Sequence, residues 1–209
     1  MDISKFKELP IMGIVRGLDK EQAEPFFECV AASGLKTIEF ALNSQQAVSL
    51  IKAFVRLSKD RLTIGAGTVL NLEDAKKALD AGATFIVLPV LISEVVDYCR
   101  DKAIAVFPGA LTPQEIYRAW CQGATMVKVF PAKVFGPSYF KEVKAPFDDM
   151  ELLACGGVNA QNISGYFSAG ASAVAFGSSI FKKDLLKNKK YPQISSAVKA
   201  LIQAYKKLK

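Results

Sequence analysis

The sequence contains no histidine, which removes several classes of catalytic and metal-binding site. A serine–histidine–acid triad, a cysteine–histidine pair and a histidine-ligated zinc or iron site all need an imidazole. Proton transfer near neutral pH must therefore fall to a carboxylate, lysine, cysteine or tyrosine whose pKa the fold has shifted. We expect no metal site in this chain.

Cysteine pairs and long apolar runs are also missing. The four cysteines form no Cys-x-x-Cys pair and lie far apart, at Cys29, Cys99, Cys121 and Cys155. This spacing is poor material for a disulfide framework and fits a reducing compartment. No apolar run reaches the roughly 18 residues of a membrane helix, and residues 1–16 lack the apolar stretch of a signal peptide. We expect a cytoplasmic protein with no membrane partner.

The net charge of +7 is concentrated at one end of the chain. Nine lysines and one aspartate follow Phe181, so this segment carries +8 and residues 1–181 carry −1. Apolar residues recur there at helical spacing, at Ile194, Val198, Leu201, Ile202, Tyr205 and Leu208. We predict a lysine-rich helix over about 192–208 that docks on the body and turns its lysines to solvent. An anionic partner is the alternative, but we expect no nucleic-acid partner.

Short apolar runs alternate with longer helical patterns through all 209 residues. Eight runs read as strands, at Ile11–Arg16, Thr37–Leu42, Thr63–Val69, Phe85–Pro89, Ala105–Pro108, Met126–Phe130, Glu151–Cys155 and Ala173–Phe176. Glycines that can end a helix precede four of them, at Gly34, Gly82, Gly123 and Gly170. With no linker-like segment, this pattern predicts an α/β fold: a single (β/α)₈ TIM barrel over residues 1–209. The rival is an open doubly wound sheet, but no G-x-G-x-x-G turn follows the first strand.

Two charged residues, Glu39 and Lys128, interrupt otherwise apolar strands. Since side chains alternate along a strand, the bulky neighbours of each would pack on the helices and turn both charges into the barrel. Burial disfavours the charged form of a lysine, and the neutral amine is a nucleophile toward carbonyls. A nearby carboxylate could then move protons. The alternative is a structural ion pair without chemistry.

Further polar and glycine-rich groups stand where the predicted strands end. Arg16 ends the first strand and could bind a carboxylate, while Gly65-Ala66-Gly67-Thr68 ends the third, where glycines would let a ligand approach the backbone. Cys155-Gly156-Gly157 and Gly177-Ser178-Ser179 end the seventh and eighth strands. Glycine-rich turns at these two places are typical of a phosphate site in a barrel.

Several spaced motifs resemble one family over about residues 10–181. They are Thr37-Ile38-Glu39, Gly65-Ala66-Gly67-Thr68-Val69, Pro108-Gly109, Val127-Lys128-Val129-Phe130-Pro131, Phe135-Gly136-Pro137, Gly156-Gly157-Val158 and Gly177-Ser178. The chain is similar to the bacterial 2-keto-3-deoxy-6-phosphogluconate (KDPG) aldolases, which overlap with the 4-hydroxy-2-oxoglutarate (KHG) aldolases. The resemblance implies a class I aldolase, usually a homotrimer, that cleaves a 2-keto-3-deoxy-6-phospho sugar acid into pyruvate and glyceraldehyde 3-phosphate.

The resemblance also assigns roles to residues. Lys128 would form a Schiff base and Glu39 would be the general acid and base, so no cofactor is expected. The other roles concern substrate: Arg16 and Thr68 would hold the carboxylate, Pro89 and Phe130 would line the pocket, and Gly156, Gly157, Gly177 and Ser178 would bind the phosphate.

Two positions depart from the best-known phosphogluconate members. Many of those have an arginine where this chain has Asn43, and a threonine where it has Cys155, which we also place against the substrate. The pairs Asn43-Ser44 and Arg16-Gly17 look closer to the 6-phosphogalactonate aldolases of the family. We therefore expect a phosphogluconate-type substrate, with the galactonate epimer or 4-hydroxy-2-oxoglutarate as alternatives. More distant alternatives are another phosphosugar-binding barrel enzyme and a metabolite-binding protein without catalysis.

Overall fold

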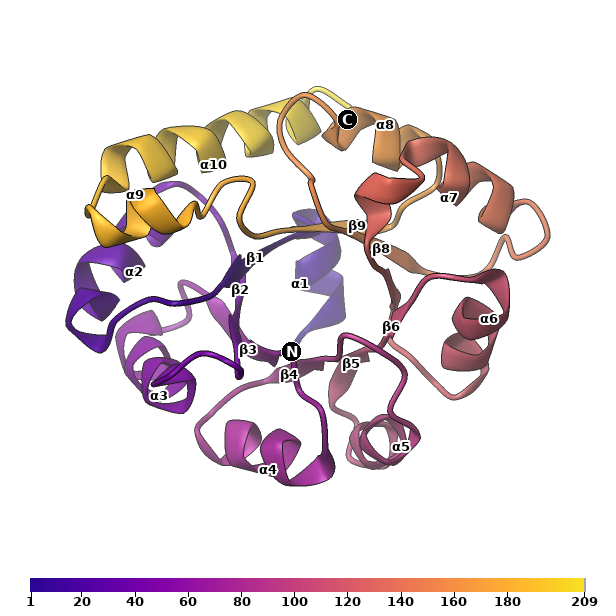
Figure 1. The fold of residues 1–209 in the computed structure, drawn as a ribbon, viewed down its shortest axis with the longest axis horizontal. Coiled ribbons are helices and arrows are strands. Elements are labelled where there is room, and N and C mark those ends of the chain that lie inside the picture. The colour runs from indigo at the N-terminus through magenta and orange to yellow at the C-terminus, as the bar shows by residue number, and fades with distance from the viewer. Residues whose placement is uncertain (209) are drawn as a thin grey trace.

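The computed structural model describes residues 1–208, and Lys209, the last residue of the predicted domain, lies outside them. Nine parallel strand segments form one sheet that curls into a barrel (Figure 1). They are β1 (Ile11–Val15), β2 (Thr37–Ala41), β3 (Thr63–Gly67), β4 (Phe85–Val87), β5 (Ala105–Phe107), β6 (Gly109–Ala110), β7 (Val127–Val129), β8 (Leu152–Cys155) and β9 (Ala173–Phe176). The order β5-β4-β3-β2-β1-β9-β8-β7-β6 confirms the predicted barrel and excludes the doubly wound sheet.

The fifth strand of the barrel is split at Pro108. Its first part, β5, pairs with β4, whereas β6 pairs with β7 on the other side. We predicted a single strand ending at Pro108, but the pairing continues to Ala110. Proline cannot donate a ladder hydrogen bond, and here only its carbonyl is used, accepting from the backbone N–H of Lys128 at 2.8 Å. The eight predicted strands thus become nine segments without changing the barrel.

Ten α-helices and two short 3₁₀ helices connect the strands within the described residues, and most of them surround the barrel (Figure 1). The α-helices are α1 (Ile3–Glu8), α2 (Ala23–Ala32), α3 (Ala47–Ser58), α4 (Leu72–Asp80), α5 (Ser93–Asp101), α6 (Pro113–Cys121), α7 (Pro137–Lys144), α8 (Ile163–Ser168), α9 (Lys183–Lys187) and α10 (Tyr191–Lys206); the 3₁₀ helices are η1 (Lys20–Gln22) and η2 (Ala132–Val134). The four glycines expected to end helices all have positive φ, between 88° and 99°. This is the left-handed conformation that glycine adopts without strain.

The C-terminal helix α10 lies along α2 and α8 on the outside of the barrel (Figure 1). Its buried side chains are Ile194, Val198, Leu201, Ile202 and Tyr205, while Leu208 beyond its end is exposed. No helix in residues 1–208 is both long and apolar enough to cross a membrane.

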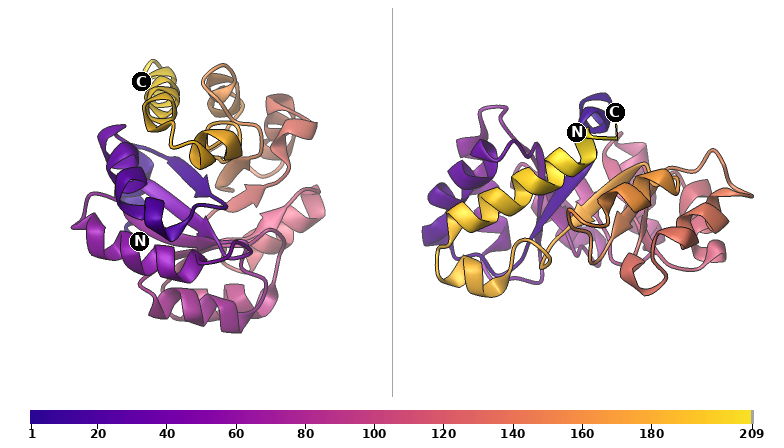
Figure 2. Two further views of the ribbon diagram at one scale, coloured as in Figure 1. Left: turned by 60° about the vertical axis from the view of Figure 1, so that its left-hand side comes forward. Right: turned by 90° about the horizontal axis from the view of Figure 1, so that it is seen from above.

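The short helix α1 was not predicted and covers one end of the barrel. Figure 2 shows it at the end opposite α9. Phe6 from this helix is buried and meets the Phe107 ring edge-on, at 6.1 Å between centroids. Phe107 also packs against Phe85 inside the barrel. The N-terminal end of the barrel is thereby filled with apolar side chains, and the functional groups collect at the other end.

Candidate active site

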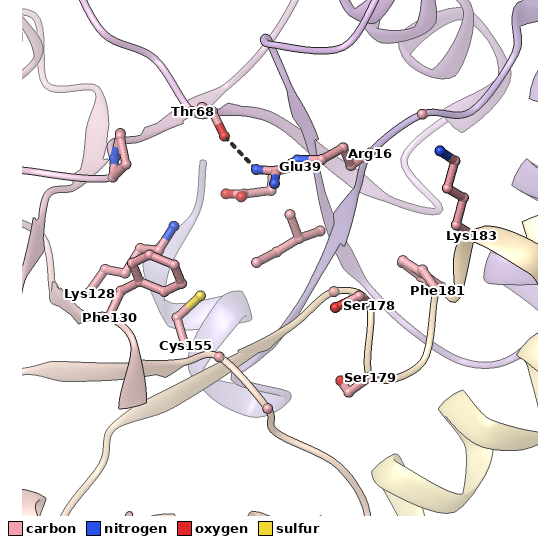
Figure 3. Close-up of a pocket in the computed structure, with 16 residues that line it drawn as sticks. Arg16, Glu39, Thr68, Lys128, Phe130, Cys155, Ser178, Ser179, Phe181 and Lys183 are labelled. Carbon is pink, nitrogen blue, oxygen red and sulfur yellow. Dashed lines mark hydrogen bonds between the residues drawn. The ribbon is translucent and has the colours of Figure 1, made fainter. Parts of the chain in front are cut away.

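A cavity of about 430 Å³ opens at the carboxyl ends of the strands. The residues to which the family resemblance assigned a role, together with Cys155, all line it: Arg16, Glu39, Thr68, Pro89, Lys128, Phe130, Cys155, Gly156, Gly157, Gly177 and Ser178. They come from seven separate stretches of chain, so the barrel, and no local motif, brings them together. Figure 3 shows the polar side chains converging on this space.

Glu39 and Lys128 reach the cavity from opposite sides of the barrel wall (Figure 3). They are 1% and 7% exposed, whereas the neighbouring Val127 and Val129 pack into the outer core, as alternation along the strand predicts. No salt bridge joins the two charged groups among the described residues. One carboxylate oxygen of Glu39, Oε2, is buried without a hydrogen-bond partner. The structural ion pair considered from the sequence is therefore not formed.

Burial raises the pKa of the Glu39 carboxyl, and the positive charges of Lys128 and Arg16 oppose this shift. Desolvation is the larger influence because the carboxylate loses contact with water. A raised pKa makes the protonated form more accessible than in an exposed glutamate, which suits a carboxyl that both accepts and donates a proton. The Lys128 ammonium lies 5.4 Å from the centroid of the Phe130 ring, which forms part of the cavity wall.

Gly65 and Gly67 of β3 lie against side chains of the protein itself, whereas the sequence predicted that they would admit a ligand. A Cβ at Gly67 would lie 2.3 Å from Oε1 of Glu39, and a Cβ at Gly65 would lie 2.3 Å from the Phe85 ring. These glycines therefore make room for other side chains of the protein. The prediction that they let a ligand approach the backbone was wrong for both positions.

Arg16 and Thr68 form a polar pair at the end of β1 and β3. The guanidinium donates a hydrogen bond to the Thr68 hydroxyl at 3.2 Å, and Figure 3 shows it beside Glu39. Thr68 has a φ of 55°, which is unusual for a β-branched residue. The loop that follows Arg16 is held by Ser44, whose hydroxyl accepts a hydrogen bond from the Gly17 N–H at 3.1 Å. This arrangement leaves further guanidinium donors available to a carboxylate.

Cys155 is buried and points into the cavity near Lys128 (Figure 3). Burial raises the pKa of its thiol to about 11, and the positive charges of Lys128 and Arg16 only partly offset this. The group is therefore protonated near neutral pH and is a poor nucleophile. It fits the expected role of a small side chain that fills space beside the lysine.

The two glycine-rich turns lie side by side and offer open donors. Gly156 and Gly157 have φ values of 108° and 77°, and the hydroxyl of Ser179 donates to the carbonyl of Val158 at 2.6 Å, which ties the two turns together. Neither Gly156 nor Ser178 forms a hydrogen bond with a described residue. Free N–H and hydroxyl donors in a concave turn are suited to binding a phosphate.

Comparison with known proteins identifies the family. The model of the KDPG and KHG aldolase family matches residues 3–197. The chain belongs to this family. It is 33% identical over 198 residues to the 2-dehydro-3-deoxy-6-phosphogalactonate aldolase of Escherichia coli K12, covering 94% of this chain and 97% of that protein.

Two solved structures support the same assignment. A native KDPGal structure has a TM-score of 0.89 and 31% identity, covering 96% of each chain. A KDPG aldolase from Legionella pneumophila, with pyruvate captured at low pH as a covalent carbinolamine intermediate, has a TM-score of 0.85 and 25% identity, covering 92% of this chain and 93% of that one. This aldolase is thus a carbon–carbon lyase, of a family that cleaves 2-keto-3-deoxy-6-phospho sugar acids to pyruvate and a triose phosphate.

Ser179, in the glycine-rich turn predicted after the eighth strand, also lines the aldolase cavity, as do four residues that the sequence did not reveal: Ile14, Gly17, Phe181 and Lys183. Ile14 could have been found, because it shares the inward face of β1 with Arg16 two residues later. Phe181 lies in the turn after β9 and Lys183 begins α9, a helix of five residues that is too short for its period to show in the sequence which side chains face the cavity.

Proposed function

We propose that this aldolase works through a Schiff base on Lys128, with Glu39 moving the protons and with no metal or other cofactor. The observation that carries the proposal is that a buried lysine and a buried, unpaired carboxylate share one cavity. The unpaired Oε2 of Glu39 favours a catalytic over a structural role, because an uncompensated buried acceptor costs stability. The covalent carbinolamine in the Legionella relative is consistent with this chemistry.

The proposed reaction begins when the Lys128 amine adds to the C2 carbonyl of the keto acid; water then leaves with uptake of one proton, giving an iminium ion. The Glu39 carboxylate takes the proton of the C4 hydroxyl. The C3–C4 bond then breaks, its electrons flow into the iminium, and the triose phosphate leaves as an aldehyde. Glu39 returns the proton to C3 of the enamine, and hydrolysis of the imine releases pyruvate and restores Lys128.

The remaining residues would position the substrate. The Arg16 guanidinium and the Thr68 hydroxyl lie beside Glu39 and would hold the carboxylate of the pyruvate half. The turns at Gly156, Gly157, Gly177 and Ser178 would bind the phosphate through backbone N–H groups and a hydroxyl. Pro89, Phe130 and Cys155 would form the walls around the imine.

Borohydride reduction in the presence of pyruvate tests the mechanism, because it converts an imine into a stable secondary amine. Peptide mass mapping should find the adduct on Lys128, and chelators should not change the rate. Lys128→Ala should abolish turnover, while Glu39→Gln should retain some adduct formation. The absence of an adduct on Lys128 in the active wild-type enzyme would falsify the mechanism.

The C4 configuration of the substrate needs a separate measurement. We keep the phosphogluconate epimer as the proposed substrate, with the galactonate epimer as a second candidate. The second is favoured by Arg16 in the cavity and by the identity to the Escherichia coli phosphogalactonate aldolase. The ratio of kcat/KM for the two epimers decides between them, since it reports differential binding of the transition state.

We also propose that the enzyme is a homotrimer in the cytoplasm. Apolar side chains at Val134 and Phe135 are 60% and 52% exposed, next to the active-site end of β7, and a neighbouring subunit could cover them. The four cysteines are free thiols, as a reducing compartment permits. Sedimentation equilibrium should give three chains per particle, and a monomeric mass would contradict the trimer. Cell fractionation tests the location.

A further inference from the structure

The proposed phosphate site has donors but none of its four residues carries a charge. Gly156, Gly157, Gly177 and Ser178 offer only neutral N–H and hydroxyl groups. A phosphate monoester carries close to two negative charges near neutral pH. The charged residues that line the cavity are Arg16, Glu39, Lys128 and Lys183. Arg16 is directed to Thr68 and Lys128 is the proposed nucleophile, which leaves Lys183 for the phosphate.

Lys183 is the first residue of α9 and lines the same cavity as the Gly177-Ser178 turn. Figure 3 shows its side chain on the side of the cavity where Ser178 and Phe181 lie, while the Arg16 guanidinium extends away from it toward Thr68. The Lys183 side chain is exposed and forms no salt bridge or hydrogen bond with a described residue. Its ammonium is therefore available to a ligand.

The backbone that carries Lys183 is firmly held. Two residues earlier, the Phe181 ring is 4% exposed and meets the rings of Phe176 and Phe26 at centroid distances of 5.0 and 5.3 Å. The Phe181 N–H donates to the carbonyl of Gly177 at 2.8 Å, which closes the turn after β9. The flexible part of Lys183 is thus its side chain, anchored at the rim of the proposed phosphate site.

We propose that Lys183 is the cation that binds the substrate phosphate and so favours phosphorylated over unphosphorylated keto acids. This deepens the proposed function and rests on it. The lysine and the phosphate would form a charge-assisted contact, which is stronger than a contact between neutral groups. The adjacent Lys182 has the same charge and is also exposed, but it does not line the cavity.

The test compares Lys183→Gln with Lys182→Gln as the matched control. For cleavage of the 2-keto-3-deoxy-6-phospho sugar acid, Lys183→Gln should raise KM roughly tenfold with little change in kcat. Lys183→Arg should restore KM to within about threefold, and Lys182→Gln should stay within about twofold of wild type. Inorganic phosphate should inhibit wild type competitively and inhibit Lys183→Gln more weakly.

Pyruvate provides the readout that does not involve phosphate. The pyruvate concentration that gives half-maximal borohydride inactivation should be the same in wild type and in Lys183→Gln. An equal change in KM for both lysine variants, an unchanged KM for Lys183→Gln, or a parallel shift in the pyruvate dependence would overturn the proposal. Failure of the Schiff-base mechanism is recognised separately, because the wild-type enzyme would then show no pyruvate-dependent inactivation.

Discussion

The Glu39 carboxylate lies against the backbone of Gly67, so a single missing side chain determines where the proposed acid and base can sit. In Gly67→Ala the new Cβ would occupy the place of Oε1, and the carboxylate must move. A displacement of about 1 Å at a catalytic group can reduce the rate on the order of 100-fold. We therefore predict a fall in kcat of that size, measured by pyruvate release in a coupled assay.

The displaced carboxylate should leave imine formation largely intact, so borohydride trapping of pyruvate on Lys128 should persist in Gly67→Ala. Gly165→Ala in α8 is the control, since its Cβ would meet only the Pro137 side chain at 3.1 Å, away from the cavity. A Gly67→Ala enzyme with wild-type kcat would show that the position of Glu39 does not limit the reaction.

The raised pKa of Glu39 predicts a stability that depends on pH in a definite direction. The fold favours the neutral carboxyl, so its contribution is full below the pKa of the unfolded chain and is lost as pH rises through the raised pKa of the folded state. Glu39→Gln is neutral at every pH and avoids this loss. The free energy of unfolding of Glu39→Gln should be similar to that of wild type at about pH 4 and higher than that of wild type at about pH 8. Urea titration at each pH measures both values. If the stability advantage of Glu39→Gln over wild type became smaller as the pH rises, the assigned burial of the Glu39 carboxyl would be contradicted.

Single residues differ in how far the sequence predicts them. The inward directions of Glu39 and Lys128 follow from alternation along a strand, which is a local property. The role of Gly67 was missed because the clash arises across two strands, through the pairing of Ala41 with Gly67 in register. Lys183 was missed for a related reason: it begins α9 directly after a turn whose path depends on the packing of Phe181.

At the scale of elements, the split fifth strand depends on close contact between two backbones. A Cβ at Gly109 would lie 2.1 Å from the carbonyl oxygen of Pro89, and main-chain atoms cannot rotate aside as a side chain can. Gly109→Ala should therefore destabilise the barrel by about 1–3 kcal/mol or more, as expected of overpacking. Chemical denaturation with Gly165→Ala as the reference measures this, and equal stabilities would show that the split strand tolerates the extra atom.

The elements themselves were predictable to different degrees. Long amphipathic helices and short apolar strands have clear periods, and the glycine turns mark the junctions, so the barrel could be inferred from one sequence. The helix α1 has six residues and buries only Phe6, too few for a period to emerge. The switch of partners at Pro108 also leaves no local pattern, because it results from closing the barrel around its circumference.

For the molecule as a whole, the lysines of the C-terminal helix segment form a solvated surface that is separate from the active-site cavity. The lysines at 199, 206 and 207 are exposed and do not line the active-site cavity, while Leu201 of the same segment is fully buried. Replacing all three lysines by glutamine should change the free energy of unfolding by no more than about 0.5 kcal/mol per site. Leu201→Ala should cost about 2–5 kcal/mol, because it leaves a cavity under α10.

The same triple lysine variant tests whether the basic end of the chain takes part in catalysis. If its lysines serve only solvation, kcat/KM for the phosphorylated substrate should stay within about twofold of wild type at physiological ionic strength, where charges beyond about 8 Å are largely screened. Lys183→Gln lowers kcat/KM under the same conditions if one placed cation, and not the overall field, binds the phosphate. A large loss in the triple variant would instead assign the anionic ligand to the positive field of the whole C-terminal segment.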